Sequence, residues 1–308
     1  MNVTVTGATG TLGQDVVRAL LERGDAVTVL SRDAERARTA LGEVRAIEWK
    51  DPKGERPPAD ALQGQDGVVH LVGEPVAQRW SESAKSEIRE SRVLSTRNLV
   101  AAIAEVDRRP AVLVSQSATG WYGARGDERL DESAPAGDDF LAQLSVEWEA
   151  EARRAEELGV RVVVNRTGMV LSDAGGALEK MLPFFKAGIG GPVAGGNQYV
   201  SWVHLDDVVG AILFELDTDA ASGPINLTAP DAATNKELSK ALGRALRRPA
   251  FAPVPALGVK ALYGEMASIV ITGQRAVPAR LTELGYRFRR PALEPAIRDA
   301  TGSTQPES

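Results

Sequence analysis

The stretch that most constrains this chain is its first 13 residues, MNVTVTGATGTLG. Valines alternate with polar residues at its start, which predicts a strand. Gly7, Gly10 and Gly13 follow at a Gly-x-x-Gly-x-x-Gly spacing, and an amphipathic helix is expected over residues 14–23. Glycines remove the β-carbons that would block a pyrophosphate, and a helix N-terminus offers N–H groups and partial positive charge to phosphates. This order of strand, glycine turn and helix predicts a dinucleotide-binding fold.

The composition of the 308-residue chain excludes several classes of function. A net charge of −6 and the lack of a dense basic stretch argue against nucleic acid as a partner. The chain has no cysteine, which excludes disulfides, thiolate metal ligands and a cysteine nucleophile, and fits a cytoplasmic location. His70 and His204 are its only histidines, so we expect no metal site. A strand begins at residue 1 and no run of about 18 apolar residues occurs, so we expect no signal peptide and no membrane partner.

Strand and helix patterns alternate along the first two thirds of the chain. Strands are expected at residues 26–30, 44–49, 68–72, 111–114 and 160–165, and helices at residues 34–41, 81–106 and 141–158. Parallel strands joined by helices need right-handed crossovers and a sheet covered on both faces. The predicted fold class is therefore α/β, with a Rossmann-type doubly wound parallel sheet.

Glycine-rich segments follow the sixth expected strand and indicate a second lobe. We expect a Rossmann domain that binds the dinucleotide over residues 1–171 and 201–220. A smaller α+β lobe for the substrate is expected over residues 172–200 and 221–296. The polar residues 297–308 are expected to form a flexible tail.

The end of the second expected strand bears on the choice of dinucleotide. Sites that prefer NAD place a carboxylate there, where it binds the ribose 2′-hydroxyl. In this chain the strand ends in Ser31 and Arg32, a hydroxyl and a guanidinium that suit a 2′-phosphate. Asp33 follows one residue later, and its alternative role is to cap the next helix. We therefore expect NADP(H) to be preferred over NAD(H).

Several longer motifs resemble the extended short-chain dehydrogenase/reductase superfamily, and within it the epimerase-family subgroup that carries a small C-terminal domain of unknown function. They include TGATGTLG (6–13), LSRD (30–33), HLVGEP (70–75), SATGWYG (117–123) and GGPVAGGNQYVSWVHLDDV (190–208). The resemblance covers essentially residues 1–296. The family's name derives from its superfamily and does not identify a reaction.

The resemblance implies a set of residues around the cofactor. Those under the pyrophosphate would be Gly7, Gly10, Thr11, Leu12 and Gly13, and those at the adenosine phosphate Ser31 and Arg32. Those at the end of the fourth strand would be Leu71, Val72 and Gly73, joined by Arg92 and Glu87 from the long helix. Those near the nicotinamide would be Ser115, Gln116, Ser117 and Arg166. For Glu87 the alternative is an ordinary solvated charge on a helix face.

The chain departs from this superfamily at the catalytic residues. Members normally use Tyr-x-x-x-Lys on the helix after the fifth strand, where the lysine lowers the tyrosine pKa for proton transfer. A glutamate usually lies four residues after that lysine. Aligning Glu149 with this glutamate puts Ser145 at the lysine position and Leu141 at the tyrosine position. No lysine lies between Lys85 and Lys180, so the usual pair is absent.

Other residues are candidates for the missing chemistry. Tyr122 is either a proton donor or part of the pocket wall, because an unassisted phenol with a pKa near 10 is a poor base. Ser117 or Thr119 is a candidate to polarise a substrate carbonyl. His204 either caps the helix that follows it or lines the site, and Asp206 is expected to cap that helix.

Two functions remain open. The first is an NADP(H)-dependent oxidoreductase or epimerase-like enzyme that acts on a small polar molecule, such as a nucleotide sugar. The second is a non-catalytic protein that binds or senses NADPH and contacts a partner through its C-terminal lobe. By analogy with the superfamily, the long helices after the fourth and fifth strands would form a homodimer.

Overall fold

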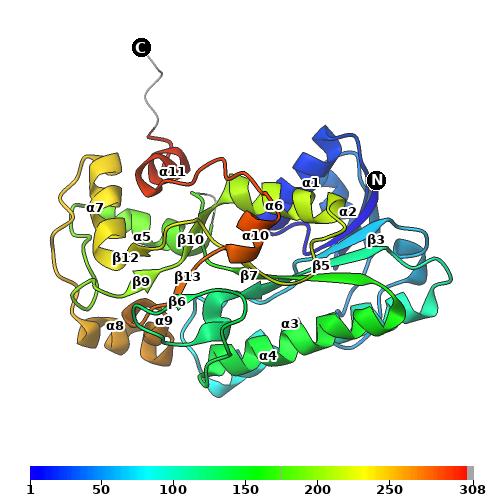
Figure 1. The fold of residues 1–308 in the computed structure, drawn as a ribbon, viewed down its shortest axis with the longest axis horizontal. Helices are drawn as coiled ribbons and strands as arrows, with labels where there is room; N and C mark the ends of the chain where they lie inside the picture. Colours follow the sequence, from blue (N-terminus) through cyan, green and yellow to red (C-terminus); the bar gives the residue numbers. More distant parts are fainter. Residues whose placement is uncertain (174, 304–308) are drawn as a thin grey trace, which may run out of the picture.

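A computed structural model describes residues 1–173 and 175–303 (Figure 1). Its centre is a seven-stranded parallel sheet with the order β11-β7-β5-β4-β1-β2-β3. The strands are β1 (Asn2–Thr6), β2 (Ala26–Ser31), β3 (Arg45–Glu48), β4 (Gly67–His70), β5 (Val112–Ala118), β7 (Arg161–Thr167) and β11 (Gly223–Leu227). The chain begins at β1, builds outward to β3, and then crosses to β4 on the other side of β1. This switch of direction is that of a doubly wound Rossmann-type sheet, so the predicted fold class is confirmed.

Two layers of helices cover the faces of the sheet (Figure 1). The helices on one side are α1 (Thr11–Glu22), α2 (Ala34–Leu41) and α6 (Leu205–Asp217), and those on the other are α3 (Glu82–Glu105) and α4 (Phe140–Arg153). Successive side chains of a strand point to opposite faces. Val112 and Val114 of β5 therefore pack in the core with α1 and α6, and Leu113 between them packs in the core with α3. Both faces are apolar, as a buried parallel sheet requires.

A smaller lobe follows the sheet. Its short strands pair as β8 (Met169–Leu171) with β10 (Trp202–His204), β9 (Tyr199–Val200) with β12 (Ala233–Thr234), and β13 (Arg275–Ala276) with β6 (Arg129–Leu130). Its helices are α5 (Gly176–Lys186), α7 (Asn235–Leu246), α8 (Ala256–Tyr263), α9 (Ser268–Ile271), α10 (Ala279–Glu283) and α11 (Leu293–Ala300). Four 3₁₀ helices in the described residues are η1 (Ala59–Ala61), η2 (Thr119–Tyr122), η3 (Arg154–Leu158) and η4 (Gly264–Ala267). Because β7 leads directly into β8, the carboxyl ends of the large sheet face this lobe (Figure 1).

Besides shifts of a few residues at the ends of helices and strands, three differences from the prediction change the description of the fold. Residues 223–227, which we expected in the smaller lobe, form the edge strand β11 of the large sheet, because Ile225 and Leu227 bury their side chains in its core. The helix expected over residues 141–158 ends at Arg153 and continues as η3. The expected tail begins later, because Ile297 and Ala300 of α11 are buried against α7, and residues 304–308 lie outside the described part. The remaining division into two lobes stays a prediction.

Among the described residues, no helix is long and apolar enough to cross a membrane.

Candidate active site

The glycine turn after β1 brings three backbone segments into contact. Gly7 has φ of +67°, and a β-carbon on it would lie 2.7 Å from the carbonyl oxygen of Leu71. A β-carbon on Gly13 would lie 2.3 Å from the carbonyl oxygen of Gly7. Gly10 precedes helix α1 and has no side chain to cap it, and the Gly10 N–H donates to Gly7 O at 3.0 Å. These glycines leave a bare backbone at the N-terminus of α1, which fits a pyrophosphate.

The end of β2 presents an available cation. Ser31 Oγ donates to Asp33 O at 3.0 Å, and Asp33 Oδ1 accepts from the Arg36 N–H at the start of α2. The capping alternative for Asp33 is therefore confirmed. Arg32 is exposed and has no carboxylate partner within residues 1–173 and 175–303, so its guanidinium is free to bind an anion.

A buried histidine supports the end of β4. His70 Nδ1 lies 2.7 Å from Thr6 Oγ1, and its Nε2 lies 3.0 Å from Thr96 Oγ1. Thr6 Oγ1 also accepts from the Leu71 N–H at 3.2 Å, and Thr96 Oγ1 accepts from Trp148 Nε1 at 3.0 Å. Burial lowers the pKa of His70 to about 3, so the ring is neutral. The network joins β1, β4, α3 and α4 directly beneath the predicted cofactor residues.

Arg92 and Glu87 of α3 have different surroundings. The Arg92 guanidinium packs against Gly73, donates to Glu74 O at 2.9 Å and stacks 5.2 Å from the Trp148 ring. Arg92 therefore supports the loop after β4, where Val72 and Gly73 are expected to meet the cofactor. Glu87 forms a partly exposed ion pair with Lys53 at 2.6 Å, as expected for a solvated charge, and its predicted cofactor contact finds no support in this geometry.

The carboxyl ends of β5 and β7 hold a buried cluster of charged and polar groups. Ser117 Oγ donates to Glu149 Oε1 at 2.7 Å. Arg166 binds the same carboxylate through Nε at 2.9 Å and Nη2 at 3.0 Å, and its guanidinium stacks 3.8 Å from the Trp121 ring. Although burial alone lowers the pKa of a guanidinium, the bonds and charge of Glu149 raise the pKa of Arg166. The cluster is a fixed ion pair with a serine hydroxyl attached to it.

Tyr122 lies behind this cluster and is fully buried. Its hydroxyl is 2.6 Å from Asn226 Oδ1 and accepts from Arg166 Nη1 at 3.2 Å. Burial raises the pKa of the Tyr122 hydroxyl. The catalytic role that we predicted for Tyr122 does not fit this geometry, because its hydroxyl is enclosed and its hydrogen bonds are used inside the protein. The alternative, a structural role in the wall of the site, fits.

Gln116, next to Ser117 in β5, has a side-chain donor without a hydrogen-bond partner among the described residues. Its Oε1 accepts from Thr167 Oγ1 at 2.7 Å, whereas its buried Nε2 has no hydrogen-bond partner among the described residues. A buried amide without a partner is uncommon and is satisfied when a ligand supplies an acceptor. A carboxamide or carbonyl oxygen fits this position. Ser115 is fully buried within β5 and packs as part of the strand.

The two positions aligned with the missing catalytic pair have ordinary packing roles. Leu141 packs against Gly120, and Ser145 Oγ donates to the Leu141 carbonyl at 2.8 Å within α4. Neither residue is an acid or base at neutral pH.

His204 caps α6 with its ring. Its Nδ1 accepts from the Asp206 N–H at 3.1 Å, so the capping alternative is confirmed and the cap that we expected from Asp206 is wrong. The His204, Asp206 and Asp299 ligand atoms lie within 4.8 Å of one another. Arg290 Nε already approaches Asp299 at 3.3 Å and Asp206 at 3.8 Å, so a guanidinium supplies the positive charge and we assign no metal there.

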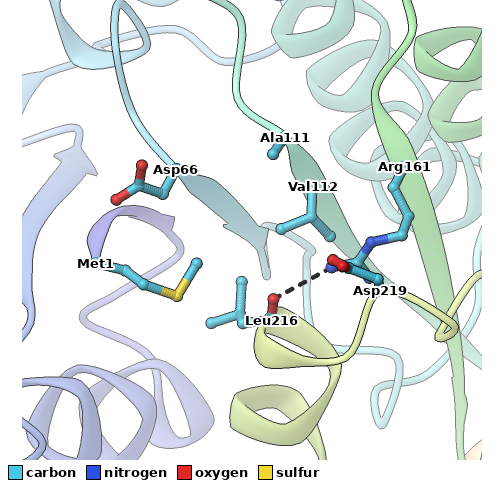
Figure 2. A pocket seen from close by; sticks show the side chains of 7 residues that line it. All are labelled: Met1, Asp66, Ala111, Val112, Arg161, Leu216 and Asp219. Atoms are coloured by element: carbon cyan, nitrogen blue, oxygen red, sulfur yellow. Dashed lines mark hydrogen bonds between the residues drawn. The ribbon is translucent and has the colours of Figure 1, made fainter.

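A hollow lies at the opposite, amino edge of the sheet (Figure 2). It is lined by Met1, Asp66, Ala111, Val112, Arg161, Leu216 and Asp219. Arg161 donates to the carbonyls of Glu215 and Ala221 at 2.9 and 2.7 Å and of Leu216 at 3.2 Å, so it caps the C-terminus of α6. Its donors are used within the protein, which indicates a structural role for this edge.

Sequence reasoning missed part of the buried cluster. Nothing local tied Asn226 to Tyr122, because the two residues are 104 positions apart in the chain. Glu149 had one usable signal, its place in the superfamily pattern, but nothing local tied it to Ser117.

Comparisons with known proteins identify the family of this chain. Residues 3–227 match the model of the NAD dependent epimerase/dehydratase family, and residues 254–300 match a domain of unknown function (DUF1731). The chain is 40% identical to the "Epimerase family protein SDR39U1 homolog, chloroplastic" of Arabidopsis thaliana, over 97% of this chain and 86% of that protein. It is 40% identical to the epimerase family protein Mb2239 of Mycobacterium bovis, over 97% of both chains.

Solved structures point to the same family. The human epimerase family protein SDR39U1 with NADPH superposes with a TM-score of 0.87 at 32% identity, covering 98% of this chain and 99% of that one. A nucleoside-diphosphate sugar epimerase from Corynebacterium glutamicum superposes with a TM-score of 0.79 at 32% identity, covering 99% of this chain and 59% of that one. The chain therefore belongs to the NAD-dependent epimerase/dehydratase family, within the extended short-chain dehydrogenase/reductase superfamily.

Proposed function

We propose that this protein is an NADP(H)-dependent oxidoreductase in which Ser117 and Glu149 replace the usual tyrosine and lysine as the proton-transfer pair. The observation that carries the proposal is the 2.7 Å hydrogen bond from Ser117 Oγ to a buried carboxylate at the carboxyl end of β5. The substrate class is a small polar carbonyl or alcohol, such as a nucleotide sugar.

The cofactor half rests on residues that fit a dinucleotide. The bare backbone at Gly7, Gly10 and Gly13 would hold the pyrophosphate, and Arg32 would bind a 2′-phosphate. Gln116 Nε2 would donate to the carboxamide or to the substrate. When bound, the nicotinamide supplies or accepts the hydride. The NADPH in the related human structure supports this choice.

The proton path starts at the substrate hydroxyl. Ser117 Oγ donates a hydrogen bond to Glu149 Oε1, so its lone pairs point away from that carboxylate and can accept a hydrogen bond from the substrate hydroxyl. In the oxidation direction, the substrate proton passes to Ser117 Oγ while the serine proton passes to Glu149 Oε1. Reduction reverses both transfers. Arg166 holds the carboxylate in place through two hydrogen bonds, and Tyr122 holds Arg166.

A specific observation also favours the second function, a protein that binds or senses NADPH without turnover. Leu141 and Ser145 offer no acid or base, and Tyr122 is enclosed. In that case the cluster of Ser117, Glu149 and Arg166 only stabilises the pocket, and no substrate is transformed.

Steady-state kinetics separate the two functions. We expect NADPH oxidation to accelerate with at least one member of a panel of keto sugars, nucleotide sugars and other small carbonyls. Ser117→Ala should then lower kcat by about 10²-fold or more with the NADPH Kd unchanged. Tyr122→Phe, the matched loss of a hydroxyl, should lower kcat much less. No turnover with any of the panel would favour the binding function, and equal kcat losses in both variants would contradict the assigned roles.

A cytoplasmic location and a homodimer, both expected from the sequence, stay predictions that size measurement and fractionation can test.

A further inference from the structure

The outer end of the smaller lobe exposes large apolar side chains. Phe251 is 80% exposed, Leu257 79%, Leu262 63% and Ile189 61%, and Phe184 is also exposed. Of the exposed large apolar side chains in residues 1–173 and 175–303, only Met1 and Val146 lie outside residues 184–269. Apolar groups gathered on one surface mark an interaction site, whereas isolated ones need no explanation.

These residues come from segments that lie side by side. The Ile189 N–H donates to Phe184 O at 3.1 Å. The loop that follows pairs with the loop before α8, because the Val254 N–H donates to Pro192 O at 2.9 Å and the Ala194 N–H donates to Val254 O at 3.0 Å. In Figure 1, the loop from α7 to α8 and helix α8 lie at the end of the lobe away from the large sheet.

Helix α8 contributes most of this surface. Its sequence, ALGVKALY, is apolar except for Lys260, yet Val259 is its one buried residue. An apolar helix that buries a single side chain leaves most of its apolar surface uncovered by the described residues.

The charged side chains in residues 184–191 and 247–262 all carry positive charge. Lys186, Arg247, Arg248 and Lys260 are exposed, and none has a carboxylate partner within the described residues. Residues 247–262 contain no Asp or Glu, although the whole chain has a net charge of −6. We call the five apolar side chains and these four cations the outer patch.

The positive charge of the outer patch limits which kind of partner can bind there. A second copy of the chain would meet the outer patch with the same patch, because a twofold interface is self-complementary. That arrangement would bring like charges together, which is unfavourable. An occupant that accepts apolar side chains and carries negative charge meets both requirements, and the surface of an anionic phospholipid bilayer does so.

From this combination of exposed apolar side chains and unpaired cations, we propose that the outer patch docks the protein on the surface of membranes that contain anionic lipid. Phe251, Leu257 and Leu262 insert at the level of the headgroups, and the cations bind lipid phosphates. This is attachment without a spanning helix, and it revises the expectation of no membrane partner. It does not depend on the reaction proposed for the carboxyl edge of the sheet.

Co-sedimentation of the full chain with vesicles tests the proposal. We expect binding to phosphatidylcholine vesicles that contain phosphatidylglycerol, and at least about tenfold weaker binding to pure phosphatidylcholine. The double variants Phe251→Ser with Leu257→Ser, and Arg247→Gln with Arg248→Gln, should each weaken binding about tenfold or more. Val146→Ser, which removes an exposed apolar side chain from α4, is the control and should bind like the unchanged protein.

Two results would overturn the proposal. One is no binding of the unchanged protein to anionic vesicles. The other is binding that the two double variants leave intact. Size measurement of the same proteins distinguishes the competing occupants: a dimer lost in the Phe251 and Leu257 variant, without vesicle binding, would assign the patch to a second copy.

Discussion

The two halves of the carboxyl edge are built in different ways. Around β1, β2 and β4 the site is made of backbone, shaped by Gly7 and Gly13, which approach neighbouring carbonyls too closely for a β-carbon. Around β5 and β7 it is made of side chains, with Ser117, Glu149 and Arg166 hydrogen-bonded together and only 3–5% exposed. The first half follows the superfamily pattern and the second half does not. We therefore expect binding of the dinucleotide and the chemistry done with it to be separable in this fold.

The largest effect on stability should come from removing a charge from the side-chain half of the site, around β5 and β7. Glu149→Gln leaves the Arg166 guanidinium buried without its counter-ion and should lower the free energy of unfolding by about 3–5 kcal/mol. Denaturant unfolding measures this loss. Glu147→Gln, on the same helix, removes a partner from the exposed pair with Arg89 and should cost less than about 1 kcal/mol. Similar losses of unfolding free energy in both variants would show that the buried ion pair contributes no more to stability than the exposed one.

The backbone half, around β1, β2 and β4, should lose NADPH affinity when Gly7 is replaced. Gly7→Ala places a β-carbon against Leu71 O at a φ of +67°, so the turn must shift and NADPH affinity should fall about 30-fold or more. Calorimetric titration gives the affinity. Gly42→Ala is the control, because Gly42 also has a positive φ, +78°, but nothing lies within 4 Å of its added carbon. It should lower stability alone, and a loss of NADPH binding there would contradict the steric argument.

His70, which lies beneath the backbone half at the end of β4, should make the stability of the protein depend on pH. His70 has a pKa of about 3 in the folded protein against 6.5 as a free group. As the pH falls from 6.5 toward 3, the unfolded chain takes up a proton that the folded protein refuses. The free energy of unfolding should therefore fall by up to about 1.4 kcal/mol per pH unit. His70→Gln should remove this part of the slope, and unfolding curves of both proteins across the range measure it. Parallel curves would contradict the lowered pKa, because they would mean that His70 takes up its proton over the same pH range in the folded protein as in the unfolded chain.

The smallest effect concerns the choice of nucleotide. Arg32→Ala should weaken NADPH binding about tenfold and leave NADH nearly unchanged, because only NADPH carries the 2′-phosphate. Competitive binding measurements give both constants. Arg36→Ala, an exposed arginine on α2, is the control and should change neither. Equal weakening of NADPH and NADH by Arg32→Ala would show that this guanidinium does not touch the phosphate.

The same contrast explains how much the sequence could predict. Apolar strands, helices and the glycine turn are local patterns, so the sheet and the backbone half could be derived from them. The side-chain half depends on contacts such as Tyr122 with Asn226, which no local pattern records. Two local errors also have physical causes. The segment 223–227 joined the large sheet because its apolar residues complete that core, and a histidine ring took the helix cap where an aspartate was expected.

The most direct test of the separation between the two halves is calorimetric titration of NADPH and NADH into the unchanged protein and into Ser117→Ala. We predict that NADPH binds more tightly than NADH and that Ser117→Ala changes its Kd by less than about twofold. No binding of NADPH to the unchanged protein, or its loss in Ser117→Ala, would contradict this account of the site.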